Sequence, residues 1–122
     1  MSEVPDNLSY TKDHEWMLVD DDGKIRVGIT DHAQDALSDV VFVELPEIGS
    51  KYSEGDAMAV AESVNAASDI YAPVSGEIVE VNDKLEESPE LINESPYEFG
   101  WMVVMVPDKE LENSLDSESY RK

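Results

Sequence analysis

The apolar residues of this chain occur in short bursts with a period of two, and each burst ends at turn-forming residues. Ile25, Val27 and Ile29 show the pattern, because alternate residues fall on one face of an extended strand. The segment 20–23 before them reads Asp-Asp-Asp-Gly and predicts a tight turn after a strand at 14–19. These two strands are expected to form a hairpin. Several such short strands indicate a mainly β fold.

The same pattern predicts five further strands, at 40–45, 57–63, 67–71, 76–81 and 100–106. The strand at 40–45 has apolar residues on both faces, so it is expected to be well buried. A short helix is predicted at 31–38, with Thr30 or Asp31 as its N-cap, and another at 109–115. We expect one domain over residues 1–122, with its core at about 10–106 and a C-terminal helix and tail at 108–122.

The charge of the chain is strongly one-sided. It has 29 Asp plus Glu against 8 Lys plus Arg, a net charge of −21. This argues strongly against binding to nucleic acid and to anionic membranes, which both require basic surfaces. The acidity indicates either a well-solvated surface or steering toward basic patches on partner proteins. No run is long enough for a transmembrane helix, and residues 1–9 lack the pattern of a signal peptide. We expect a cytoplasmic protein of a prokaryote or a mature organellar form.

The sequence offers little material for catalysis. Cysteine is absent, which excludes disulfides, thiol nucleophiles and cysteine metal sites. His14 and His32 have no third ligand at a useful spacing, so no metal site is predicted. No nucleophile–base pair or glycine-rich phosphate loop is present, so we predict no catalytic residue and no enzymatic activity. Trp16 and Trp101 fall on predicted core strands and are expected to pack there.

Several motifs follow one another along most of the chain. They are 10–16 (YTKDHEW), 27–34 (VGITDHAQ), 40–46 (VVFVELP), 62–78 (ESVNAASDIYAPVSGEI), 80–82 (EVN), 91–97 (LINESPY) and 100–102 (GWM). In this order they resemble the H proteins of the glycine cleavage system, a lipoyl-carrier family. The resemblance implies a barrel-sandwich hybrid of the biotinyl/lipoyl-carrier type. Such a fold has two antiparallel sheets with short added helices, and the hairpin at 62–71 would be exposed at one end.

The resemblance also implies a carrier role rather than an enzymatic one. In the family, lipoate is attached by a lipoate ligase or transferase to a lysine at the hairpin tip. The lipoyl arm takes an aminomethyl group from a pyridoxal-phosphate glycine decarboxylase to a tetrahydrofolate-dependent aminomethyltransferase. Dihydrolipoamide dehydrogenase then reoxidises the arm. The cofactor supplies the chemistry, and the rigid tip raises its local concentration at each partner.

Asn65 stands where the family has the lipoylated lysine. A carboxamide is a poor nucleophile, so residue 65 cannot form the amide bond to lipoate. Lys51 and Lys84 are distant in sequence. Asparagine is common in tight turns, so the hairpin should still fold. We therefore predict that lipoate is absent and that the chain docks with the partners without carrying a group. The alternative is a non-carrier binding or scaffold homologue that docks with the glycine decarboxylase.

Asparagine at this position has three possible origins. It can be an engineered or accidental change, a natural loss of lipoylation, or an error in the sequence. The family pattern is intact on both sides of residue 65. That favours a recent or artificial change, because an old loss should have blurred the neighbouring residues as well.

The hairpin residues around this position are expected to shape recognition by the ligase and the partners. They are Glu62, Ser63, Val64, Ala66, Ala67 and Asp69. Glu15 and Asp69 have two interpretations. Each carboxylate could lie near a cleft that shelters the loaded arm and hold its ammonium group by a charge-assisted hydrogen bond. Each could equally be an ordinary solvated acid, which the large number of acids favours.

Overall fold

The structure is a computed structural model that describes residues 8–20, 22–64 and 66–108 of the chain. One sheet contains β1 (Ser9–Tyr10), β2 (Glu15–Val19), β3 (Ile25–Ile29), β9 (Val103–Pro107), β8 (Gly76–Val81) and β5 (Lys51–Tyr52), in that order. The other contains β4 (Val40–Glu44), β6 (Ala57–Ser63) and β7 (Ala67–Tyr71). The helices are α1 (Asp31–Leu37), α2 (Lys84–Glu87) and α3 (Leu91–Glu94).

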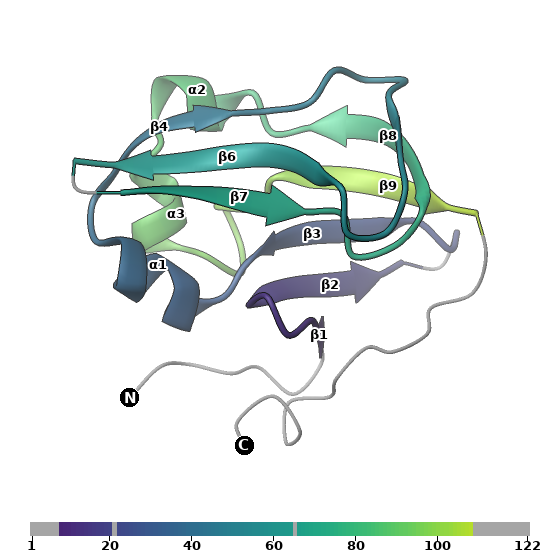
Figure 1. Ribbon diagram of the computed structural model, residues 1–122, viewed down its shortest axis with the longest axis horizontal. Coiled ribbons are helices and arrows are strands. Elements are labelled where there is room, and N and C mark those ends of the chain that lie inside the picture. The colour runs from purple at the N-terminus through teal and green to yellow at the C-terminus, as the bar shows by residue number, and fades with distance from the viewer. Residues whose placement is uncertain (1–7, 21, 65, 109–122) are drawn as a thin grey trace.

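All strand pairs in both sheets are antiparallel. In Figure 1 the three helices lie on the left, on the side where β6 ends and β7 begins. The prediction of a mainly β fold with two antiparallel sheets and short helices is therefore confirmed.

The β2–β3 hairpin forms as predicted, and its turn is stabilised locally. The Asp20 carboxylate accepts the backbone N–H groups of Asp22 and Lys24, each at 2.9 Å. Gly23 has φ +82°, a conformation that glycine adopts at little cost. The register pairs Met17 with Val27 and places both side chains in the core between the sheets.

A second, smaller apolar cluster lies at the outer edge of the six-stranded sheet. It consists of Leu8, Tyr10 and Trp16, which are all buried. The indole N–H of Trp16 donates to the Pro96 carbonyl at 2.8 Å, so the ring is fixed at both its apolar and its polar end. Gly28 lies under this ring, because a Cβ there would come within 2.6 Å of indole atoms.

Helix α1 begins as its sequence predicts. Thr30 is the N-cap, and its hydroxyl accepts the N–H of Ala33 at 3.2 Å. The side-chain amide of Gln34 donates to the Asp31 carboxylate at 2.6 Å, which adds support to the first turn. The helix ends at Leu37, and Ser38 follows with φ +71°.

The expectation that the 40–45 strand is well buried was wrong. Val41 and Phe42 on β4 are 53% and 51% exposed. A register shift between Val40 and Phe42 interrupts the pairing with β6, as in a β-bulge, and breaks the alternation of buried and exposed side chains. β4 is also an edge strand of its sheet, so no neighbouring strand covers one of its two edges.

The last strand also differs from its prediction at 100–106. It begins at Val103, so Trp101 precedes it and is half-buried rather than a core-strand residue. The side-chain amide of the buried Asn82 donates to the carbonyls of Phe99 and Trp101 at 2.9 and 2.8 Å, which holds this segment as a loop. The guanidinium of Arg26 lies 5.2 Å from the Trp101 ring centroid. The predicted helix at 109–115 lies outside the described residues.

Candidate functional site

The hairpin of β6 and β7 is closed by Ser63 and Ala66. The N–H of Ser63 donates to the Ala66 carbonyl at 2.7 Å. The Ser63 hydroxyl accepts the N–H of Ala66 at 3.1 Å and donates to the Ala66 carbonyl at 3.3 Å. Val64 is 81% exposed, and Ala66 is exposed as well. The residues on either side of Asn65 in the sequence therefore face solvent, while Asn65 itself lies outside the described residues.

The hairpin brings the predicted recognition residues together around this turn. Glu62 pairs with Ala67, and Val60 pairs with Asp69 two residues further from the turn. Glu62 and Ser63 are half-buried, whereas Ala67 and Asp69 are exposed. Apart from Asn65, all the hairpin residues predicted for recognition thus lie on one continuous ribbon that a partner can reach.

Glu15 is not a surface acid, so that interpretation was wrong for this residue. It is 1% exposed at the start of β2. Its carboxylate accepts the N–H of Tyr71 at 2.7 Å and the hydroxyl of Thr11 at 3.1 Å. Burial raises the pKa of Glu15 to about 7, although these two hydrogen bonds act in the opposite direction. The buried carboxyl links the six-stranded sheet to β7, whereas Asp69 on β7 is exposed as a surface acid would be.

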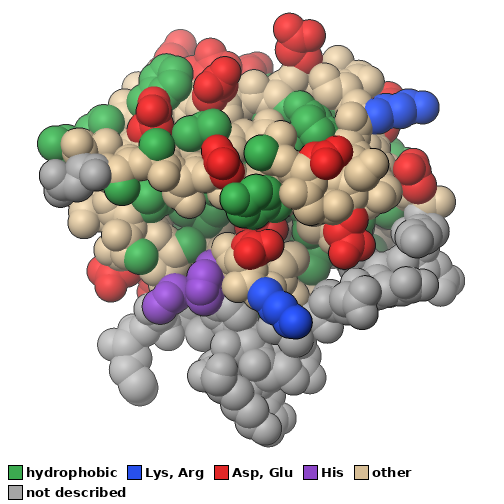
Figure 2. Space-filling view, viewed as in Figure 1, with side chains coloured by type: hydrophobic (Ala, Val, Ile, Leu, Met, Phe, Trp, Pro, Cys, Tyr) green, Lys and Arg blue, Asp and Glu red, His purple; other side chains and the backbone are tan. Residues whose placement is uncertain are grey.

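The two histidines lie side by side, as Figure 2 shows. Their ring centroids are 4.4 Å apart and the rings are tilted by 40°. Burial lowers the pKa of His14, and the neighbouring His32 lowers it further. Among the residues that the structure describes, no cluster of three or more His, Asp or Glu could hold a metal ion. The sequence could not show this contact, because the two residues come from different elements.

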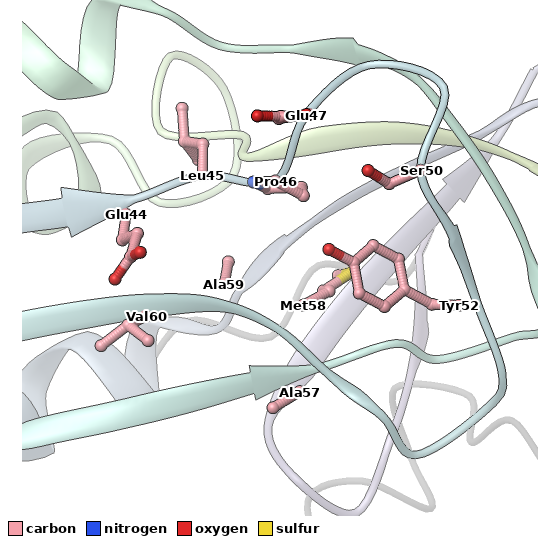
Figure 3. A pocket seen from close by; sticks show the side chains of 10 residues that line it. All are labelled: Glu44, Leu45, Pro46, Glu47, Ser50, Tyr52, Ala57, Met58, Ala59 and Val60. Atoms are coloured by element: carbon pink, nitrogen blue, oxygen red, sulfur yellow. The ribbon is translucent and has the colours of Figure 1, made fainter.

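An open groove lies at the other end of β6, and sequence reasoning missed it. Its volume is about 440 Å³, and one wall is formed by the segment 44–52. Figure 3 shows Tyr52 over Met58, and Glu44 of β4 beside Val60 of β6. No sequence pattern predicts the groove, because its walls come from two separate segments.

Comparison with known proteins decides the family. The family model described as glycine cleavage H-protein matches residues 8–122. The chain belongs to this family. It is 55% identical to a glycine cleavage system H protein of Teredinibacter turnerae, covering 100% of this chain and 95% of the relative. It is 58% identical to one of Escherichia coli, covering 98% and 95%.

A solved structure shows the same architecture. The crystal structure of a glycine cleavage system H protein from Mycobacterium marinum matches with a TM-score of 0.88 and 41% identity. The match covers 96% of this chain and 95% of that one. The barrel-sandwich fold of the lipoyl-carrier type is thereby confirmed. The members of this family are lipoate-carrying proteins of the glycine cleavage system and are not enzymes. No helix in the described part of the chain is long and apolar enough to cross a membrane.

Proposed function

We propose that this chain is an H-protein scaffold that docks with the glycine cleavage enzymes and is not lipoylated. The observation that carries the proposal is the identity of residue 65, which is asparagine and lies in the turn between β6 and β7. Ser63 and Ala66 bridge β6 and β7 directly, and the chain has asparagine at position 65 between them. A carboxamide has no nucleophilic amine with which to form the amide bond to lipoate.

The lysines of the described chain support the same view. Lys51 is on β5 and Lys84 is on α2. Lys12 lies between β1 and β2, and Lys24 lies between β2 and β3, so none of these four lysines belongs to the β6–β7 hairpin. The residues present therefore do not fit a covalently attached lipoyl group at the turn. Transfer of the aminomethyl group remains the role of lipoylated relatives, and this chain would compete for the same partners.

The proposed partners are the glycine decarboxylase, the aminomethyltransferase, dihydrolipoamide dehydrogenase and the lipoate ligase or transferase. Family membership supports them, because an H protein works within the glycine cleavage system. The contact residues that we propose are those next to the turn: Glu62, Ser63, Val64, Ala66, Ala67 and Asp69. A single domain and a cytoplasmic location remain predictions from the sequence.

Glycine–bicarbonate exchange, reconstituted with the decarboxylase, tests the proposal. The chain, Asn65→Lys and the matched carboxamide control Asn65→Gln are each treated with lipoate ligase beforehand. We expect exchange only with Asn65→Lys, because only lysine supplies an amine. Exchange supported by the unchanged chain would contradict the absence of lipoylation. A fully lipoylated Asn65→Lys protein without exchange would instead indicate a binding homologue that is no longer a carrier scaffold.

A further inference from the structure

The side chain of Asn93 on α3 ties this helix to two other elements. Its amide nitrogen donates to the Ser38 carbonyl at 2.7 Å and to the side-chain oxygen of Gln34 at 2.9 Å. Its amide oxygen accepts the N–H of Val40 at 2.8 Å. Gln34 lies on α1, and Val40 begins β4. One half-buried asparagine therefore holds both the end of α1 and the start of β4 against α3.

The connection that Asn93 holds is strained. Ser38 has φ +71° and ψ −151°, a backbone conformation that is largely restricted to glycine. A serine keeps such a conformation only where the surrounding structure enforces it, and residues of this kind are concentrated at functional sites. The Ser38 carbonyl and the Val40 N–H are both bonded to Asn93. These hydrogen bonds stabilise the strained connection from both of its sides.

The strained connection leads directly to the β6–β7 turn. Val40, the first residue of β4, pairs with Ser63, the last residue of β6. Ser63 closes the turn through its N–H and its hydroxyl, which both bond to Ala66. A register shift after Val40 separates the Val40–Ser63 pair from the regular β4–β6 pairing, so this pair depends on the anchor at Val40. Figure 1 shows α1 and α3 on the side where β6 ends and β7 begins.

We propose that Asn93 is a positioning residue for the β6–β7 turn. By fixing the Ser38 carbonyl and the Val40 N–H, it holds Val40 against Ser63 and keeps the turn in one geometry. Lipoate ligase is the enzyme that requires this geometry, because the side chain at position 65 has to be presented to its active site. Asn93 acts through Val40 and Ser63 and not on the reacting groups. The proposal rests on the proposed function only in taking residue 65 as the position that the ligase recognises.

Amide hydrogen exchange of the complete chain, measured residue by residue by NMR, tests the positioning directly. The reporter is the Ser63 N–H, which donates to the Ala66 carbonyl at 2.7 Å. The reference is the Asp20 N–H, which closes the β2–β3 hairpin by donating to the Lys24 carbonyl at 2.9 Å. We expect Asn93→Ala to speed exchange at Ser63 by about 10-fold, the factor for the net loss of about one hydrogen bond, and to leave Asp20 unchanged.

Asn82→Ala is the matched control. Asn82 also donates its side-chain amide to two backbone carbonyls, but it holds the loop before β9 and not the start of β4. Its variant should leave exchange at Ser63 unchanged. Ser38→Gly tests the strain, because glycine adopts this conformation at little cost. In the Ser38→Gly background, Asn93→Ala should therefore speed exchange at Ser63 by a smaller factor than in the parent.

A second substitution of Asn93 serves where Asn93→Ala does not fold. Asn93→Asp keeps an oxygen for the Val40 N–H and loses the donor to the Ser38 carbonyl. Exchange at Ser63 should increase in this variant as well.

The consequence for the ligase is measured in Asn65→Lys, which supplies an amine at the turn. Addition of Asn93→Ala should lower kcat/KM for lipoylation, followed by intact mass, by about 10-fold. Addition of Asn82→Ala should leave kcat/KM unchanged.

The outcomes separate positioning from a general loss of stability. Unchanged exchange at Ser63 in Asn93→Ala, or equal acceleration at Ser63 and Asp20, would overturn the proposal. Equal acceleration at Ser63 by Asn82→Ala, or faster exchange at Ser63 without slower lipoylation, would overturn it as well. Complete absence of lipoylation in Asn65→Lys would instead contradict the proposed function, and amide exchange would then decide the role of Asn93.

Discussion

The buried carboxyl of Glu15 makes the stability of this protein depend on pH in a direction opposite to that of a salt-bridged acid. Its pKa is 4.5 in an ordinary setting and about 7 in the fold. Between these values the unfolded chain has released the proton while the folded chain still holds it. The free energy of unfolding therefore falls as the pH rises through this window. A pKa difference of this size corresponds to about 3 kcal/mol of stabilisation. This stabilisation is present below pH 4.5 and is lost progressively as the pH rises to about 7.

Glu15→Gln isolates this contribution. The amide oxygen of glutamine can still accept the Tyr71 N–H, which lies 2.7 Å from the carboxylate, but glutamine does not ionise. Urea unfolding at pH 5 and pH 8 gives the loss of stability between the two values for each protein. We expect that loss to be smaller in Glu15→Gln than in the parent by about 2.5 kcal/mol, because roughly a quarter of the effect is already lost at pH 5.

The high net charge requires a control, because self-repulsion among the acids also changes with pH. Glu44→Gln removes one exposed carboxylate of the same type and should leave the loss of stability nearly unchanged. Equal reductions of the loss in Glu15→Gln and Glu44→Gln would refute a special contribution of the buried Glu15 carboxyl.

Three further variants test the packing and the hairpin, each by urea unfolding. Gly28→Ala should lower the free energy of unfolding by about 1–3 kcal/mol, because the added Cβ would lie only 2.6 Å from indole atoms of Trp16. An unchanged stability would contradict this. Ser63→Ala removes both side-chain bonds of the turn and should cost about 1 kcal/mol, whereas the exposed Ser53→Ala should cost almost nothing. Asn82→Ala leaves two loop carbonyls without their donor and should cost about 1–3 kcal/mol; a loss below 0.5 kcal/mol, about the lower end for one hydrogen bond, would show that the loop does not depend on it.

Local signals predicted the features that depend on neighbouring residues. The β2–β3 hairpin follows from the Asp20 and Gly23 turn, and helix α1 follows from its Thr30 cap and the Asp31–Gln34 pair. These elements could be predicted because the groups that stabilise them lie within a few residues in sequence.

Features that depend on distant partners could not be predicted. The burial of Glu15 is set by Tyr71, which lies 56 residues away and donates to its carboxylate. The exposure of Phe42 depends on a register shift against β6 and on the edge position of β4, and neither can be read from the 40–45 segment. Likewise β1 and β5 are two residues long and exist only through their pairing with β2 and β8.

The candidate site was predicted mainly from a resemblance and not from periodicity. The hairpin motif at 62–78 identified the turn, and the structure confirms that β6 and β7 meet there through Ser63 and Ala66. The groove beside Tyr52 gave no sequence signal, since its lining comes from segments with ordinary strand and loop patterns.

Intact mass after co-expression with a lipoate ligase tests the central claim most directly, because it reads the attachment itself and needs no partner enzyme. The measurement compares this chain with Asn65→Lys, followed by peptide mapping of the hairpin. We expect an unmodified mass for this chain and a lipoyl increment for Asn65→Lys. A lipoyl increment on the unchanged chain, mapped to residue 65, would contradict it.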